Sequence, residues 1–240
     1  MNINNNLSFV IPVFNEKQNI RILVDEILEL SPKLASFEII IVDDGSDENI
    51  YSEICDADKV VYIKHKKNLG QGKALLTGIE KAKFDIIVTL DGDLQNDVKD
   101  IFKMYYLMIQ KNLDMVCGYR KNRKDPLLKN ISSRISYFFR ELLLKDNIYD
   151  SGCALKVCKK NALLSVRLDK NFFMFVTALF EFEGFKVGQC IVTHRPRMHG
   201  NTKYSYLSQF FTGFSYIFYL YFIRKIKRKN RKGEEAGKPG

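Results

Sequence analysis

The sequence predicts an α/β protein with a mostly parallel central sheet flanked by helices. In the first half of the chain, short runs of β-branched residues alternate with segments whose apolar residues recur at helical spacing. The segment 37–43 contains a continuous β-branched run, as is typical of a strand that is covered on both faces. The chain has 240 residues, of which 46% are hydrophobic, so it can bury a large core.

The expected elements alternate regularly at first and less regularly later. Strands are expected at residues 7–13, 37–43, 60–64, 85–90 and 114–119. Helices are expected at residues 17–30, 70–83 and 98–112, with a polar helical piece at 47–57. In the second half, helices are expected at 128–145 and 172–185 and a strand at 186–195, and the glycine-containing segment 149–157 could re-enter the sheet.

The net charge of +10 is concentrated near the carboxyl terminus. Residues 195–232 contain ten Lys and Arg and no Asp or Glu, which equals the whole excess. Such a segment suits an anionic membrane surface, a phosphorylated ligand or nucleic acid. We expect no nucleic-acid partner, because aromatic residues do not alternate with the basic run and no recognition motif is present.

Residues 206–223 form an uncharged, aromatic segment, and seven of the next nine residues are basic. Three interpretations stay open: a helix lying in the membrane interface, a single shallow span, and a soluble amphipathic or dimerisation helix. The aromatic content and the basic flank favour the first of these.

The cysteines and the amino terminus indicate a cytosolic protein. The five cysteines are scattered without a CxxC pair or a His at metal spacing, so we expect reduced thiols. The first residues lack the basic and apolar regions of a signal peptide.

Polar motifs follow three of the expected strands at the point where each strand ends. They are Asn15-Glu16, Asp43-Asp44-Gly45-Ser46 and Asp91-Gly92-Asp93. In open sheets of this kind, ligands bind beyond the carboxyl ends of the strands. The motifs therefore predict one binding site at this edge of the sheet.

Asp91 and Asp93 are the strongest candidates for metal ligands. Residues i and i+2 of an extended segment project to the same side, so their carboxylates would repel one another without a cation. Mg²⁺ and Mn²⁺ prefer carboxylate oxygens, and Gly92 allows a ligand to approach closely. The alternative is a solvated turn in which an Asp caps the next helix.

Two further motifs suit a nucleotide. Carboxylates such as Asp43 and Asp44 can accept hydrogen bonds from a base or ribose, although an Asp-Gly turn with Ser46 capping a helix would explain them too. In "NLGQGK", glycines and Lys73 precede or open an expected helix and suit an anion, or they form a flexible helix cap. The spacing matches neither a P-loop nor the dinucleotide-binding fingerprint.

Four motifs together resemble the family 2 glycosyltransferases with a GT-A fold: "FVIPVFNE", "IIIVDDGS", "NLGQGKALLTGI" and "LDGDLQND". Farther along, "GYR", "SGCALK" and "RMHGNTKYS" resemble the polyprenyl-phosphate branch, the dolichyl-phosphate mannose synthase-like enzymes. The resemblance implies a GT-A catalytic domain at residues 1–204, with a donor and metal half at 1–120 and an acceptor half at 121–204. A membrane-associating helix with its basic flank would occupy 205–232, and a disordered tail 233–240.

The resemblance also implies a sugar-nucleotide donor, UDP- or GDP-linked, and a divalent metal, Mg²⁺ or Mn²⁺. Asp91 and Asp93 would hold the metal against the diphosphate. The residues that would surround the donor are Pro12, Val13, Asn15, Glu16, Asp43, Asp44, Lys73, Asp91, Gly92 and Gln95.

For the acceptor, the resemblance implies polyprenyl phosphate at the cytoplasmic face of the cell membrane and inversion at the anomeric carbon. The cations near the family's phosphate-contacting positions are Arg120, Arg134, Arg197 and Lys203. Arg134 could instead lie on the polar edge of an amphipathic helix, and Arg197 on the surface. The chain departs from this branch in having Thr202 before Lys203. It also departs in the motif "SGCALKV", which lacks the Arg found in the "GFR" version of that motif.

Asp150 separates two kinds of acceptor. If a saccharide hydroxyl were the acceptor, Asp150 would be the general base that takes its proton. With a phosphate acceptor, Asp150 would orient the donor sugar or an Arg, or it would belong to a structural turn. An inactive relative serving as a scaffold is a further alternative, which the intact acidic motifs disfavour. Among the histidines, His65 is expected at the surface, whereas His194 and His199 could meet a pyrophosphate.

Overall fold

The computed structural model describes residues 2–121, 135, 137–144, 148–166, 172–198 and 213–225. The chain divides into two compact units. Unit 1 comprises residues 1–123 with 150–201, and unit 2 comprises residues 124–149 with 202–240.

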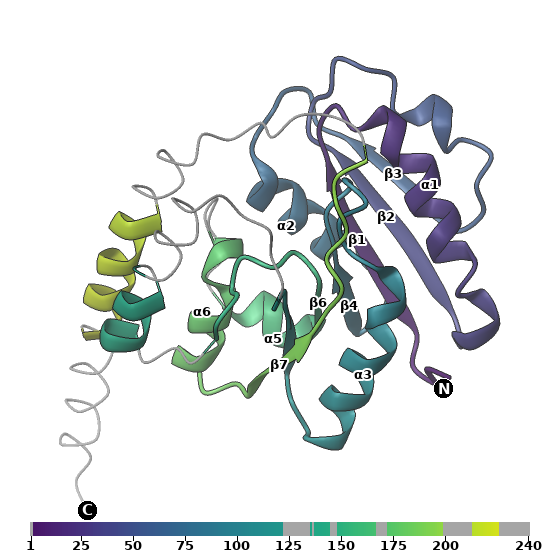
Figure 1. Cartoon of the computed structure of the whole chain (residues 1–240). Helices are drawn as coiled ribbons and strands as arrows, with labels where there is room; N and C mark the ends of the chain where they lie inside the picture. Colours follow the sequence, from purple (N-terminus) through teal and green to yellow (C-terminus); the bar gives the residue numbers. More distant parts are fainter. Residues whose placement is uncertain are drawn as a thin grey trace, which may run out of the picture. The chain divides into compact units, whose positions relative to one another are not determined.

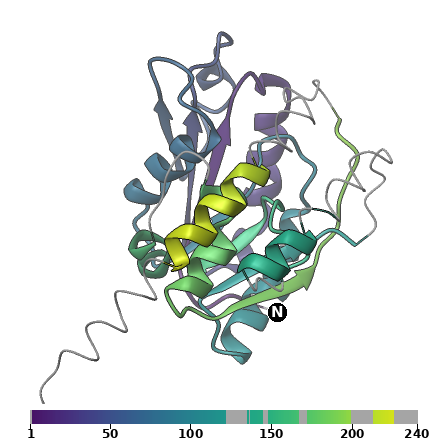
Figure 2. The same ribbon diagram turned by 90° about the vertical axis from the view of Figure 1, so that its left-hand side faces the viewer.

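Unit 1 contains a seven-stranded sheet with the strand order β3-β2-β1-β4-β6-β5-β7 (Figure 1). The strands are β1 (Leu7–Val13), β2 (Phe37–Asp43), β3 (Val60–Lys64), β4 (Ile86–Thr89), β5 (Met115–Tyr119), β6 (Lys156–Lys159) and β7 (Val187–Ile191). Only β6 runs antiparallel to its neighbours, so the prediction of a mostly parallel sheet is confirmed. The dark blue β3 and the light green β7 form opposite edges of the sheet (Figure 2).

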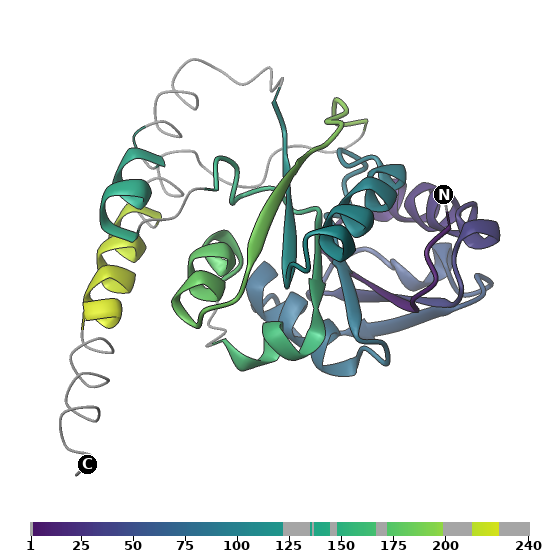
Figure 3. The ribbon, with the colours of Figure 1, turned by 90° about the horizontal axis from the view of Figure 1, so that it is seen from below.

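Helices cover both faces of this sheet. They are α1 (Lys17–Leu28), α2 (Gln71–Lys81), α3 (Ile101–Gln110), α5 (Lys160–Ser165) and α6 (Val176–Phe182), with the 3₁₀ turns η1 (Ser31–Lys33), η2 (Tyr51–Glu53), η3 (Val98–Asp100) and η5 (Phe172–Met174). In Figure 3, α1 and α3 lie on one side of the sheet, and α2 and α5 lie on the other.

The burial of the strands explains their apolar sequences. Every residue of β1 and β2 is buried between the two helical layers. On the α2 side the layers approach closely, because a Cβ on Gly78 would lie 2.4 Å from Val10 Cγ1. Gly78 therefore allows α2 to pack directly against β1.

The prediction of a helical piece at 47–57 is wrong, since only the 3₁₀ turn η2 forms there. Asn49 and Ser52 explain the difference. The Ser52 amide donates to Asn49 Oδ1, and the Ser52 hydroxyl donates to the Asn49 carbonyl. Side chains of this type compete with helical hydrogen bonds and favour turns.

In unit 2, residues 135, 137–144 and 213–225 are helical, with a π-helical turn at Arg140–Leu144. Phe139 packs edge to face on Phe214, with ring centroids 4.9 Å apart. These ranges confirm parts of the helices expected at 128–145 and 206–223, and the remainder lies outside the described residues. None of the helices in the described ranges is long and apolar enough to cross a membrane.

Candidate active site

The chemically distinctive side chains of unit 1 gather at the carboxyl edge of the parallel strands. Strands β1, β2, β4, β5 and β7 all end at this edge. Because β6 is antiparallel to β4 and β5, the segment that precedes β6 starts at the same edge. The loops that carry Glu16, Asp91, Arg120, Asp150 and Arg197 can therefore form a single site.

Other side chains hold the acid pair, Asp91 and Asp93. Gln71, the first residue of α2, donates from Nε2 to Asp91 Oδ1 at 2.6 Å. Arg197 donates from Nη2 to Asp93 Oδ2 at 2.7 Å. The Gln95 amide donates to Asp93 Oδ1 at 3.2 Å. A guanidinium and two neutral donors thus share the negative charge of the pair.

These partners only partly offset the repulsion within the pair. Burial, and then the charge of Asp93, raise the pKa of Asp91 from 3.8 to about 7, against the opposing charges of Arg120, Lys156 and Arg197. Two ionised carboxylates at this place are therefore costly without a further cation.

The pair fits a divalent cation that also binds a phosphorylated ligand. The described residues contain no cluster of three or more His, Cys, Asp or Glu side chains that could hold a metal. The protein would thus supply the Asp91 and Asp93 oxygens, and ligand or water oxygens would complete the shell, as is usual for Mg²⁺.

Gly92 is required by the protein's own packing. A Cβ at this position would lie 2.8 Å from Val13 Cγ1, at the end of β1. The absence of a side chain brings the acid pair against the β1 end, where Pro12, Val13, Asn15 and Glu16 lie. The contact made by Gly92 is thus with β1, and the expected close approach of a ligand stays a prediction.

The carboxylates after β2 are buried and hydrogen-bonded. Asp43 has no exposed surface and accepts from the Ser46 amide at 2.8 Å and from the Tyr62 hydroxyl at 2.6 Å. Asp44 accepts from the amides of Leu69 and Gly70 at 3.0 and 2.7 Å. Asp44 therefore fixes the loop that leads directly into Gln71.

The expectation that His65 lies at the surface is wrong. Its side chain is 10% exposed and pairs through Nδ1 with Asp44 Oδ1 at 2.7 Å. Its other nitrogen, Nε2, lies 3.0 Å from the Thr77 hydroxyl. His65 thus ties the end of β3 to α2, a long-range contact that its sequence neighbours do not reveal.

Arg120 and Asp150 form a bidentate ion pair. Arg120 donates from Nε to Asp150 Oδ2 at 2.7 Å and from Nη2 to Oδ1 at 2.8 Å. The two side chains are 13% and 8% exposed. Burial lowers the pKa of Arg120, but the hydrogen bond and charge of Asp150 outweigh it, and the net shift is upward. Both oxygens of Asp150 therefore accept hydrogen bonds from a permanent cation, which fixes the orientation of the carboxylate.

Lys156 is a further buried cation next to this pair. It is 1% exposed, donates from Nζ to the Cys153 carbonyl and lies 4.0 Å from the centre of the Phe173 ring. The Cys153 amide in turn donates to the Asp150 carbonyl. Lys156 thus supports the turn that carries Asp150.

The segment after β7 crosses the loop that follows the acid pair. Asn96 and His194 form an isolated antiparallel bridge, and the Arg195 amide donates to the Gln95 carbonyl. Two residues later, Arg197 lies between Asp93 and Glu16, with Nη1 3.6 Å from Glu16 Oε1. Arg197 is therefore part of the site and not an isolated surface residue.

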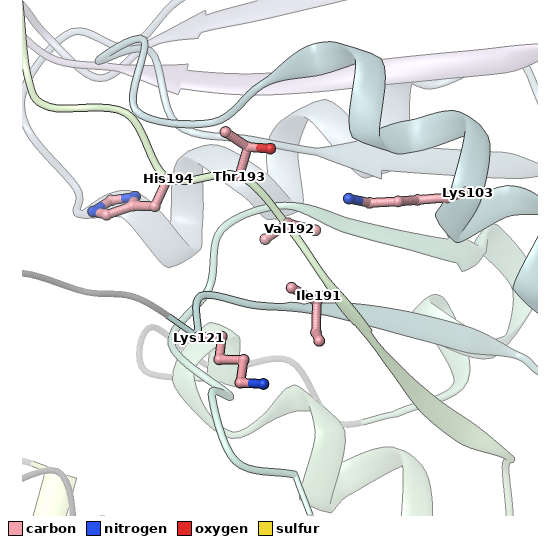
Figure 4. Close-up of a pocket in the computed structure, with 6 residues that line it drawn as sticks. All are labelled: Lys103, Lys121, Ile191, Val192, Thr193 and His194. Carbon is pink, nitrogen blue, oxygen red and sulfur yellow. The ribbon is translucent and has the colours of Figure 1, made fainter.

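A cavity of about 340 Å³ adjoins this segment on the β7 side. Lys103, Lys121 and residues 191–194 line it, and Lys103 extends toward it from α3 (Figure 4). The Lys103 ammonium is 2.8 Å from Asp100 Oδ1, so part of its charge is neutralised. The acid pair does not line this cavity, and we assign no donor contact to it.

The remaining candidates fall into two groups. Lys73 lies exposed in the first turn of α2, two residues beyond Gln71. Arg134, Lys203 and His199 lie outside the described residues.

Two residues of the site, Gln71 and Lys156, were not predicted from the sequence. Gln71 is uncharged, and Lys156 lies in a strand, where burial of a cation is unusual.

Comparisons with known proteins show the family of this chain. The model of the family described as Glycosyl transferase family 2 matches residues 8–167. A dodecaprenyl-phosphate galacturonate synthase of Rhizobium johnstonii is 32% identical over 98% of this chain and 71% of its own length. An undecaprenyl-phosphate 4-deoxy-4-formamido-L-arabinose transferase of Pectobacterium atrosepticum is 29% identical over 84% of this chain, which matches 63% of that relative.

A solved structure resembles the fold. Glucosyl-3-phosphoglycerate synthase from Mycobacterium tuberculosis, crystallised with Mn²⁺, UDP and glucosyl-3-phosphoglycerate, has a TM-score of 0.65 and 16% identity. The match covers 80% of this chain and 73% of that structure. At this identity the likeness concerns the fold alone, and it agrees with the expected GT-A architecture.

Proposed function

The chain is a member of glycosyl transferase family 2, and we propose that it transfers a sugar from a UDP- or GDP-sugar to polyprenyl phosphate. The two relatives named above carry polyprenyl-phosphate acceptors in their names, which supports this acceptor class. The observation that carries the proposal is the meeting of an acid pair with two arginines, Arg120 and Arg197, at one edge of the sheet.

The acid pair is the proposed place for the donor's diphosphate and its cation, Mg²⁺ or Mn²⁺. When bound there, a divalent cation stabilises the charge that develops on the departing nucleoside diphosphate. Asp91 and Asp93 orient their carboxylates toward the cation, and Gln71 and Gln95 hold one oxygen of each. The structure of similar fold was crystallised with Mn²⁺ and UDP, which supports a divalent cation in general.

The nucleoside is proposed to lie beside the ends of β1 and β2. Asn15 and Ser46 are joined there, since the Asn15 amide donates to Ser46 Oγ at 2.8 Å. Asp43 would contribute indirectly, because it is buried and fixes Ser46 and Tyr62 through hydrogen bonds. Lys73, exposed on the first turn of α2, is placed near the nucleotide pocket and supplies positive charge.

A phosphate acceptor needs cations more than it needs a base. A phosphate monoester is already anionic at pH 7, so its oxygen can attack the anomeric carbon without losing a proton, with inversion of configuration. Arg197 binds Asp93 and the charge of Arg120 acts on Asp91, and guanidinium suits phosphate geometry. Arg134 and Lys203 belong to the same proposal.

The ion pair with Arg120 gives Asp150 a positioning role in this proposal. A general base for a saccharide hydroxyl needs an oxygen that can receive a proton. Both Asp150 oxygens already accept from Arg120, so the phosphate acceptor is the better fit. The hydroxyl alternative predicts that Asp150→Asn abolishes activity and Arg197→Ala spares it. The phosphate acceptor predicts severe loss from Arg197→Ala or Lys203→Ala.

Unit 2 is proposed to bind an anionic membrane surface at the cytoplasmic face. Large apolar side chains are exposed on both of its described helical segments: Phe138, Leu142, Phe218, Tyr219 and Phe222. The sequence beyond residue 223 is strongly basic. Exposed aromatic residues next to a basic run suit a helix lying at the lipid interface.

The test is a donor screen with radiolabelled UDP- and GDP-sugars, polyprenyl phosphate, and Mn²⁺ or Mg²⁺. We expect label in the organic phase only when the lipid is present and only with a divalent cation. Label found solely in water-soluble saccharide would contradict the proposed acceptor.

A further inference from the structure

We propose that Arg197 is the internal counter-ion of Asp93, and that a divalent cation must displace it before the site is complete. The displaced guanidinium would then be able to bind the acceptor phosphate. This inference rests on the proposed function, because it takes the cation and the phosphate acceptor from there.

The geometry around Asp93 carries the first step. Its Oδ2 is 2.7 Å from Arg197 Nη2, and its Oδ1 accepts from the Gln95 amide. The Arg197 and Asp93 side chains are 25% and 9% exposed, so water screens this pair only partly. A divalent cation on Asp93 Oδ2 would lie close to the guanidinium, and the repulsion between the two positive charges favours its displacement.

Asp91 is held in the opposite way. Among the described side chains, a neutral amide, Gln71 Nε2, donates to its Oδ1. An amide donor orients a carboxylate without adding a competing positive charge. Gln71 therefore prepares Asp91 for a cation, whereas Arg197 competes with that cation at Asp93.

Arg197 is well placed to be exchanged. It lies on a segment that follows β7 and is fastened two residues earlier, where Arg195 binds Glu26 at 2.7 Å and Asp97 at 3.1 Å. The anchor at Arg195 can stay in place while the Arg197 side chain changes partner. Glu16, 3.6 Å from Arg197 Nη1, gives the guanidinium a second carboxylate during the exchange.

Linkage then predicts an order of binding. A ligand that binds the released guanidinium favours the cation-bound state, and by reciprocity the cation favours that ligand. The donor and its cation would thus raise the affinity for an acceptor phosphate. Before the donor binds, the Asp93 carboxylate would hold Arg197 and weaken acceptor binding.

The experiment measures Mn²⁺ binding by electron paramagnetic resonance of the free ion, in the full chain without lipid. Arg197→Gln is expected to bind Mn²⁺ about tenfold more tightly than the wild type, a change between those for exposed and buried ion pairs. Arg21→Gln removes the same charge from α1 without touching the acid pair or the segment that carries Arg197, and it should change the affinity less than about twofold. Gln71→Ala should weaken binding.

Three results would decide the matter differently. Equal or weaker binding by Arg197→Gln, or equal tightening by both arginine variants, would overturn the displacement while leaving the proposed function intact. Failure of the wild type to bind Mn²⁺ with or without UDP-sugar would overturn the metal site of the proposed function, and this inference with it.

A short-chain prenyl phosphate tests the second step. In the wild type, this probe should tighten Mn²⁺ binding, and Arg197→Gln should abolish that effect. If the probe acted equally on both proteins, Arg197 would not be the group that connects the two sites. Circular dichroism of each variant shows whether the fold is retained.

Discussion

Replacing Arg120 by Met should destabilise the protein because it leaves the Asp150 carboxylate without its cation. The two guanidinium hydrogen bonds are 2.7 and 2.8 Å long, and the Asp150 side chain is 8% exposed. Removing one partner of a buried ion pair costs about 3 to 5 kcal/mol. The Arg120 backbone amide still donates to Asp150 Oδ2, so we expect about 3 kcal/mol, at the lower end of that range.

The assay is urea denaturation at pH 7, with Arg21→Met as the matched control. Arg21 is an ion-paired arginine as well, with Asp25 and Asp56 as its partners, but its side chain is 43% exposed. An exposed pair contributes about 0 to 1 kcal/mol, so the control should lose little. A loss of under about 1 kcal/mol for Arg120→Met would refute the argument, since the pair would then behave as an exposed one. The double variant with Asp150→Asn should recover part of the loss.

Three further outcomes follow from the structure. Because the folded-state pKa of Asp91 is raised from 3.8 to about 7, the metal-free protein binds more protons when folded and should lose stability as pH rises between these values. Asp91→Asn should remove up to about 4 kcal/mol of that loss, measured as melting temperature against pH. Gly45→Ala should destabilise by about 2 kcal/mol or more in urea, since φ is +78° and the new Cβ would lie 2.5 Å from the Lys67 carbonyl carbon. Replacing both Phe138 and Phe222 by Ser should reduce flotation with anionic liposomes severalfold without changing the melting of unit 1.

The sequence predicts the first half of the fold well because most strands there, namely β1, β2, β4 and β5, are buried. Continuous apolar runs such as residues 37–43 and helical spacing such as residues 17–30 are local signals, and both elements form. The position of β6 between β4 and β5 has no local signal in the sequence, because it depends on antiparallel pairing with strands that are distant along the chain. The helix expected at 47–57 fails because two polar side chains bond the backbone locally.

The same distinction applies to the residues of the site: some belong to local motifs, and others depend on tertiary packing. Asp91, Asp93 and Arg197 carry charge in readable motifs, and the structure brings them together. Gln71 is uncharged and its role has no signal in the sequence, because its contact with Asp91 depends on how Asp44 fixes the preceding loop. His65 and Lys156 become partners of the site only through burial, which depends on tertiary packing and not on their immediate neighbours.

The most direct test of the central claim is calorimetric titration of UDP- and GDP-sugars in the presence and absence of Mn²⁺. We expect one donor to bind only with the cation, and the double variant Asp91→Asn with Asp93→Asn to lose that binding while retaining its fold. Equal donor binding by the wild type and the double variant, with the cation present, would contradict the assignment of the acid pair to the donor's diphosphate.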